Sequence, residues 1–212
     1  MMRLLQYTLT AALMMAPAFA QKYEFTVGGG ASFYDSKTVK NPKGDAEAGF
    51  SNGFAATVAL GQNMYPRIGG EIRYTYLQND LKLKGSGGNP TFGAQAHAIH
   101  YDFLFHGTPS GSRVRPYVAA GGGVKLYRGT GTEVPFQPLS NIALLTKTQE
   151  VTGLVSGGAG VKFTVSSKVL FRIDVHDYLT PFPKKVITPA LNSSVSGWVN
   201  NIVPTAGIVF TF

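Results

Sequence analysis

Residues 115–126 read RPYVAAGGGVKL and alternate between two kinds of residue. The even positions carry mainly apolar side chains: Pro116, Val118, Ala120, Val124 and Leu126. The odd positions carry polar, charged or minimal side chains: Arg115, Tyr117, Gly121, Gly123 and Lys125. Successive side chains of a β-strand point to opposite faces of a sheet. The stretch therefore predicts a strand whose two faces meet different surroundings.

The same alternation recurs from Lys22 to the end of the chain and predicts eight strands. Besides 115–126, the strands are expected in 22–33, 50–60, 68–76, 98–105, 151–163, 169–176 and 198–212. Long polar connections are expected at Asp35–Gly49, Gln78–Pro90, Gly129–Thr148 and Leu179–Gly197. Short turns are expected at Gly61–Arg67, Gly107–Arg113 and Ser166–Lys168. Regular alternation of long and short connections indicates an up-and-down antiparallel meander with both termini at the tight-turn end.

The composition of the two faces favours a membrane barrel over a soluble barrel or sandwich. The face opposite the apolar one consists largely of Gly, Ala, Ser and Thr with a few charges, which fits a narrow eight-stranded lumen. Aromatic residues stand near the ends of the apolar face, as in the interfacial girdles of outer-membrane barrels. They are Tyr23, Phe33, Tyr76, Phe105, Phe163, Trp198 and Phe212. The prediction is an all-β, eight-stranded antiparallel up-and-down transmembrane β-barrel.

The first twenty residues have the pattern of an export signal. Arg3 precedes an apolar run from Leu9 to Ala16, and the segment closes with Ala18-Phe19-Ala20, a small-x-small cleavage pattern. Polar residues interrupt the apolar run, so a membrane-spanning helix is not expected. The predicted organisation is a cleaved signal peptide over 1–20 and a barrel over 21–212.

Composition excludes several classes of protein. The chain has no cysteine, which rules out disulfides and thiolate chemistry, and 44% hydrophobic residues argue for an ordered chain. The net charge of +8 could suggest nucleic-acid binding. However, the basic residues are scattered singly and no nucleic-acid-binding motif occurs, so no nucleic-acid partner is expected.

The export pattern, the eight alternating strands, the segment Arg115–Gly123 and the ending AGIVFTF at 206–212 together resemble the small outer-membrane β-barrel family of OmpA-like and opacity-protein-like barrels. The resemblance covers essentially all of 21–212. It implies an integral outer-membrane protein of the Gram-negative cell envelope, with both termini in the periplasm. It also implies that the terminal aromatic residue, Phe212, is the signal recognised by the outer-membrane insertion machinery. No peptidoglycan-binding domain follows Phe212, so a tether to the cell wall is not implied.

The parity of each strand places ten ionisable side chains in the lumen. The acidic residues are Glu24, Glu71, Asp102 and Asp174, and the others are Arg73, Arg115, Lys125, Lys162, Arg172 and His176. Unpaired charges in a narrow lumen are costly, so these groups are expected to form ion pairs that close the barrel. The Ser166–Lys168 turn sets a register in which Asp174 faces Gly160 and His176 faces Gly158. A gated or narrow ion path through the same charges is the alternative.

Catalysis and metal binding are not expected. Asp174, His176 and Ser156 share a face and could activate a hydroxyl for acyl transfer, for example on lipid A. They point inward, however, away from lipid, and the His-x-Ser pairing of deacylase barrels is missing. His97 and His100 are three residues apart and lie on opposite faces of their strand, so no metal site is expected. No cofactor is implied.

The long connections are the expected sites of interaction. Their lysines, among them Lys82, Lys84, Lys184 and Lys185, suit a mildly basic rim beside lipopolysaccharide phosphates. The third connection contains apolar residues that suggest a lid packed over the barrel mouth: Phe136, Leu139, Ile142, Leu144 and Leu145. The predicted function is a structural or surface-interaction role through four loops, with outer-membrane lipid as a partner and the loop partner unspecified. The alternatives are a small, weakly selective porin-like pore and, third, a lipid A-modifying enzyme.

Overall fold

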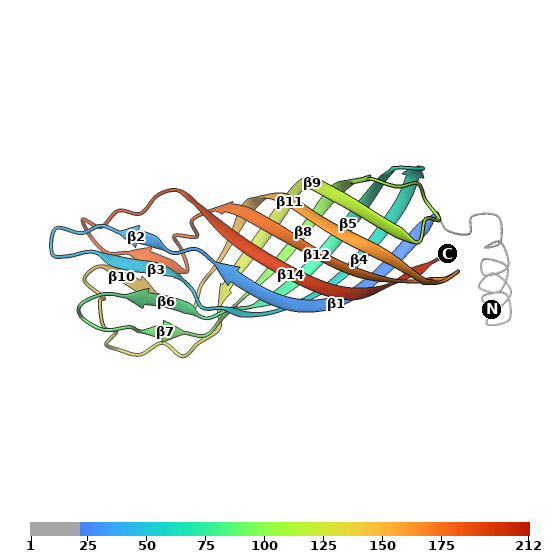
Figure 1. Ribbon diagram of the computed structural model, residues 1–212. Coiled ribbons are helices and arrows are strands. Elements are labelled where there is room, and N and C mark those ends of the chain that lie inside the picture. The colour runs from blue at the N-terminus through green and yellow to red at the C-terminus, as the bar shows by residue number, and fades with distance from the viewer. Residues whose placement is uncertain (1–21) are drawn as a thin grey trace, which may run out of the picture.

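The computed structural model describes residues 22–212, and the expected signal peptide lies outside these residues. Eight long strands form a closed antiparallel barrel in the order β1-β14-β12-β11-β9-β8-β5-β4, as the sequence predicts (Figure 1). Their bounds are β1 Tyr23–Tyr34, β4 Gly53–Tyr65, β5 Ile68–Gln78, β8 Ala94–His106, β9 Val114–Gly129, β11 Gln149–Ser166, β12 Val169–Pro181 and β14 Trp198–Thr211. Within 22–212, no helix is long and apolar enough to cross a membrane.

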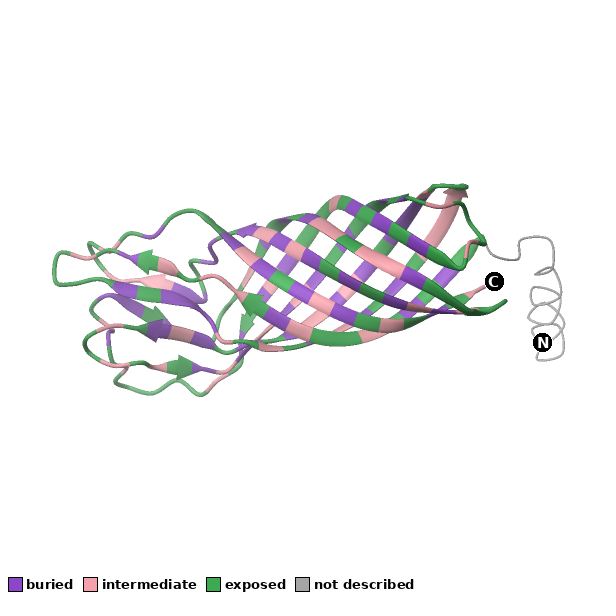
Figure 2. Cartoon of the chain, in the orientation of Figure 1, coloured by how far each residue is buried: buried purple, intermediate pink, exposed green. Residues whose placement is uncertain are grey.

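Burial alternates along the barrel strands, as Figure 2 shows by its pattern of purple and green. In β1, Glu24 and Thr26 are buried in the lumen, whereas Tyr23, Phe25 and Val27 are exposed on the outer wall. Six of the seven expected girdle residues, all but Tyr76, are among the exposed large hydrophobics: Tyr23, Phe33, Phe105, Phe163, Trp198 and Phe212. The outer wall is therefore an apolar belt suited to lipid contact.

The barrel closes where its first and last strands meet. The backbones of Tyr23 and Phe212 exchange two hydrogen bonds of 3.1 Å, and their rings stack at 6.2 Å. Phe212 therefore lies at the tight-turn end, beside the start of β1 (Figure 1). The first tight turn is shorter than the expected Gly61–Arg67, because β4 continues to Tyr65 and only residues 66–67 connect it to β5.

The four long connections contain secondary structure that the sequence analysis did not predict. They contain six short strands: β2 Lys37–Val39, β3 Ala46–Phe50, β6 Leu81–Lys84, β7 Thr91–Phe92, β10 Ala143–Leu145 and β13 Ile187–Pro189. The first four form one sheet in the order β2-β3-β6-β7, and β10 pairs with β13. We call residues 35–52, 79–93, 130–148 and 182–197 the cap. It extends the barrel at the end opposite the tight turns (Figure 1).

A single apolar core fills the cap and the adjoining half of the lumen. Leu77 and Tyr178 from the barrel wall belong to the same buried cluster as Leu83, Leu145 and Ile187 from the cap. Of the apolar residues expected to form a lid, Leu139, Ile142 and Leu145 are buried, whereas Phe136 is 78% exposed and Leu144 is 38% exposed. The apolar packing of the cap thus involves all four connections and continues into one end of the barrel.

Polar contacts also join the connections at the far tip of the cap. The Asn41 side-chain amide donates to the Ser193 hydroxyl at 2.8 Å and to the Asn141 carbonyl at 3.2 Å. These contacts join the first connection to the third and fourth. The cap is consequently one folded unit rather than four independent loops.

The packed cap predicts a contrast in amide hydrogen exchange within the third connection. The amides of Ala143, Leu145 and Thr146 each donate a hydrogen bond of 3.0 Å and should exchange slowly, whereas those of the exposed Val134 and Phe136 should exchange quickly. The measurement is hydrogen exchange followed by mass spectrometry or NMR. Fast exchange throughout 130–148 would contradict a packed cap.

Inward-facing glycines allow neighbouring strands and long side chains to approach closely, which predicts a second contrast. A Cβ at Gly121 would lie 1.9 Å from the Tyr101 carbonyl oxygen, whereas a Cβ at the outward-facing Gly157 would meet nothing within 4 Å. We expect Gly121→Ala to lower the free energy of unfolding by about 1–3 kcal/mol and Gly157→Ala to change it by less than about 0.5 kcal/mol. Urea unfolding in lipid vesicles measures both, and equal effects would show that the two positions are equally crowded.

Candidate functional site in the barrel lumen

The barrel strands place the charged side chains of the lumen in successive layers between the tight turns and the cap. The register is the one expected from the Ser166–Lys168 turn: Asp174 faces Gly160 and His176 faces Gly158. A Cβ at Gly160 would lie 2.5 Å from the Asp174 Cβ, so only glycine leaves room for this packing. The local sequence therefore fixes where the charged side chains can fold across the lumen.

The layer nearest the tight turns is built around one carboxylate. Glu24 forms an ion pair with Lys162, lies 3.4 Å from Arg115 Nη1 and accepts a hydrogen bond of 2.9 Å from the Asn63 amide. Arg115 Nη2 in turn donates to Asn63 Oδ1 at 3.2 Å. Four strands, β1, β4, β9 and β11, contribute to this layer.

The second layer contains two carboxylates and two guanidinium groups. Arg73 Nε lies 3.0 Å from Glu71, and Arg73 Nη2 lies 2.8 Å from Asp174. Arg172 contacts the same two carboxylates, with its Nε 2.5 Å from Asp174. All four side chains are at most 2% exposed. The two pairs therefore compensate each other's charge in a site that excludes water.

Asp174 also receives two neutral hydrogen bonds. The Tyr117 hydroxyl donates at 2.7 Å and the Thr205 hydroxyl at 2.5 Å. The Tyr117 ring separates the first two layers, because the Arg172 guanidinium lies 5.0 Å and the Lys162 ammonium 5.6 Å from its centroid. Tyr117 and Thr205 were not among the predicted site residues, although parity on their strands places both in the lumen.

The third layer joins one carboxylate to two histidines. Asp102 lies 3.1 Å from His100 Nδ1 and 3.2 Å from His176 Nε2. His176 Nδ1 lies 3.1 Å from Arg73 Nη1, which can only donate. The contact with Arg73 therefore requires Nδ1 to accept, and Nε2 lies on the side of Asp102. His100 extends the layer by a contact of 3.2 Å to the Tyr178 hydroxyl.

Lys125 does not fit the expectation that every charged side chain in the lumen has an ion-pair partner. Among residues 22–212 it has no carboxylate partner within ion-pair distance; its ammonium donates to Asn201 Oδ1 at 2.6 Å. Three tyrosine rings surround the ammonium, with centroids at 4.6 Å for Tyr34, 5.1 Å for Tyr127 and 5.5 Å for Tyr178. The reason is position: the residues opposite Lys125 are Ala98 and Thr152, so no carboxylate is within reach.

The geometry does not assemble the acyl-transfer set considered from sequence. The Ser156 hydroxyl donates to Asp102 at 3.4 Å, and His176 lies between Asp102 and Arg73. Neither ring nitrogen of His176 is therefore placed to accept a proton from Ser156. His97 lies on the outer wall, where its Nδ1 is 2.8 Å from the Tyr74 hydroxyl. No group of three or more metal-ligating side chains with suitable geometry occurs among residues 22–212.

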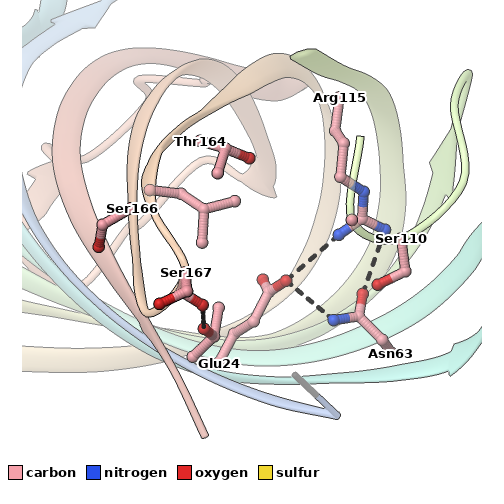
Figure 3. Close-up of a pocket in the computed structure, with 10 residues that line it drawn as sticks. Glu24, Asn63, Ser110, Arg115, Thr164, Ser166 and Ser167 are labelled. Atoms are coloured by element: carbon pink, nitrogen blue, oxygen red, sulfur yellow. Dashed lines mark hydrogen bonds and ion pairs between the residues drawn. The ribbon is translucent and has the colours of Figure 1, made fainter. Parts of the chain in front are cut away.

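A small pocket reaches the first layer from the tight-turn end (Figure 3). Its floor contains the buried Glu24, Arg115 and Leu170. Its rim is rich in hydroxyl groups from the exposed Ser110, Thr164, Ser166 and Ser167 and from the partly exposed Thr211. The pocket thus borders the charged half of the lumen, and the apolar core lies at the other end.

Comparison with known proteins agrees with this architecture. The family model of the outer membrane protein beta-barrel domain matches residues 7–185. The crystal structure of the outer membrane protein OprG from Pseudomonas aeruginosa has a TM-score of 0.60 and 14% identity, covering 91% of this chain and 97% of OprG. Neisserial surface protein A has a TM-score of 0.53 and 15% identity, covering 89% of this chain and 97% of its own. No curated protein matches the chain by sequence.

The paired layers predict a large difference between a buried and an exposed ion pair. Asp174→Ala removes the carboxylate shared by Arg73 and Arg172 and should lower the free energy of unfolding by about 3–5 kcal/mol, because two buried guanidinium groups lose a partner. Lys37→Ala removes only the surface pair with Asp35 and should change it by at most about 1 kcal/mol. Urea unfolding in lipid vesicles, followed by the single tryptophan Trp198, measures both. A similar small effect of both variants would contradict the compensation described for the second layer.

Proposed function

Because the chain belongs to the outer membrane protein beta-barrel domain family and is an integral outer-membrane β-barrel protein, we propose that it is a closed scaffold that presents its cap as an interaction surface. The observation that supports this proposal is that buried side chains occupy both halves of the lumen. The half near the tight turns is filled by paired charges, and the other half is filled by the apolar core that continues into the cap.

The proposed orientation places the cap outside the cell and both termini in the periplasm. The family architecture supports it, since outer-membrane barrels have tight periplasmic turns and long external connections. Phe212 lies at the tight-turn end, beside the start of β1, and is proposed as the signal read by the insertion machinery.

The cap has the properties of a recognition surface rather than of flexible tethers. Its packed core fixes the positions of its exposed side chains, so less conformational entropy is lost when a partner binds. Exposed lysines make parts of the surface basic: Lys40, Lys43, Lys84, Lys147, Lys184 and Lys185. We propose that those nearest the membrane contact lipopolysaccharide phosphates, while the outer part of the cap binds a partner of unspecified class.

We do not propose an enzymatic role. The hydroxyl and imidazole groups considered for acyl transfer are engaged with Asp102 and Arg73, in a lumen that faces away from lipid. The second candidate function is a narrow pore. It is favoured by one observation, the pocket that gives access to the charged layers from the tight-turn end.

Single-channel recording in planar bilayers separates the scaffold from the pore. The scaffold predicts that the native protein shows no steady openings and that Asp174→Ala alone remains closed, because the apolar half still seals the lumen. Combining Asp174→Ala with Tyr178→Ala removes side chains from both halves and should produce openings. Lys37→Ala is the control and should behave as the native protein.

Steady, ion-selective conductance of the native protein would overturn the scaffold proposal and support the pore. Openings in Asp174→Ala alone would show instead that the charged layers are the main barrier and that the apolar half does not seal.

A further inference from the structure

The layer nearest the tight turns carries an excess of positive charge. Glu24 is the one carboxylate that contacts both Lys162 and Arg115, so these three groups together carry a net charge of about +1 if each is ionised. The next layer does not supply the missing negative charge, because its two carboxylates are already shared by Arg73 and Arg172. A buried layer with a surplus of positive charge attracts an anion.

Two side chains of this region have buried donors without partners among residues 22–212. Arg115 is 2% exposed and its Nε has no hydrogen-bond partner. His106 is 5% exposed and neither of its ring nitrogens has one. Buried polar groups are normally satisfied, so unsatisfied donors point to a ligand or to water at the same place.

These groups line two small cavities that share Glu24 and Asn63. Arg115 lines the pocket at the tight-turn end, and His106 lines a second cavity that also contacts Lys162. In Figure 3 the Arg115 guanidinium extends towards Glu24, and Ser110 from the adjacent turn lies beside it. The pocket therefore combines a cationic floor with a rim of hydroxyl donors.

We propose that this pocket binds a small oxyanion such as phosphate, which enters from the tight-turn end. Arg115 is the principal ligand, because a guanidinium presents several donors suited to the oxygens of a phosphate or carboxylate group. The Ser110 hydroxyl donates from the rim. The two cations that contact Glu24, Lys162 and Arg115, outweigh its negative charge.

The site does not depend on whether the lumen conducts, since the pocket lies at one end of the barrel. The orientation given under the proposed function matters in one respect: it makes the periplasm the compartment that supplies the anion. A failure of the anion site and a failure of the scaffold proposal are therefore measured separately, by titration and by conductance.

The test is an NMR titration of the refolded protein with inorganic phosphate at constant ionic strength, with chloride as the replacement anion. We expect saturable shifts of the Arg115 Nε–Hε signal and of the Gly111 amide, a pocket residue, with cap amides unchanged. Arg115→Gln should weaken phosphate binding at least about tenfold, the loss expected for a charge-assisted contact. Arg128→Gln, an exposed arginine at the other end of β9, is the matched control and should leave binding unchanged.

A second variant covers the case in which Arg115→Gln does not fold. Ser110→Asp places a negative charge on the exposed turn at the pocket rim without altering the buried layer, and it should also abolish saturable binding. Three outcomes would each overturn the proposal and assign the unpartnered donors to water. They are shifts that increase linearly with phosphate, equal saturation by chloride, and unchanged phosphate binding in Ser110→Asp.

Discussion

A buried charge in this barrel must be compensated inside a lumen that eight strands make barely wide enough for side chains. Asp174 shows how the structure meets this requirement, since it accepts hydrogen bonds from Arg73, Arg172, Tyr117 and Thr205. Those partners come from four different strands. The hydrogen bonds to one carboxylate therefore hold four of the eight barrel strands in position relative to one another. Such pairs contribute little net stability compared with apolar packing, but removal of one partner is costly. The network therefore favours one arrangement of these strands around Asp174.

Lys125 marks the boundary between the two ways in which the lumen is filled. On the tight-turn side the charges largely compensate one another, whereas on the cap side most of the buried residues are apolar. At the boundary the ammonium is held by the Asn201 oxygen and by the faces of Tyr34 and Tyr127. The same Asn201 donates through its amide to Ser32 Oγ at 2.8 Å and to the Phe33 carbonyl at 3.2 Å, which links the first and last strands of the barrel. Through Asn201, the buried Lys125 is thus linked to the strand pair that closes the barrel.

The cap is also a consequence of the narrow lumen of an eight-stranded barrel. Once apolar side chains fill the outer half of the lumen, additional apolar side chains from the connections can extend that core beyond the barrel. Leu83 and Leu145 do so from different connections, and the short strands that carry them pair with neighbours from other parts of the chain. The result is a rigid surface at one end and, at the other, a pocket that reaches the charged layers. The two ends of the molecule are therefore suited to different interactions.

The sequence by itself determined the eight strands, their antiparallel order, the lumen face of each, and the register that sets Asp174 opposite Gly160. These features are local, because alternation has a period of two residues and a tight turn fixes the pairing of adjacent strands. The alternation Leu81-Lys82-Leu83-Lys84 was also a local signal of strand β6, but its partners lie far away in the chain. Only the tertiary structure decided that the long connections form a cap, that Lys125 is held by tyrosines rather than by a carboxylate, and that Tyr117 and His100 join the charged layers. Closing the barrel brings together strands separated by up to the whole length of the chain, and the distances across its lumen decide which charges can meet.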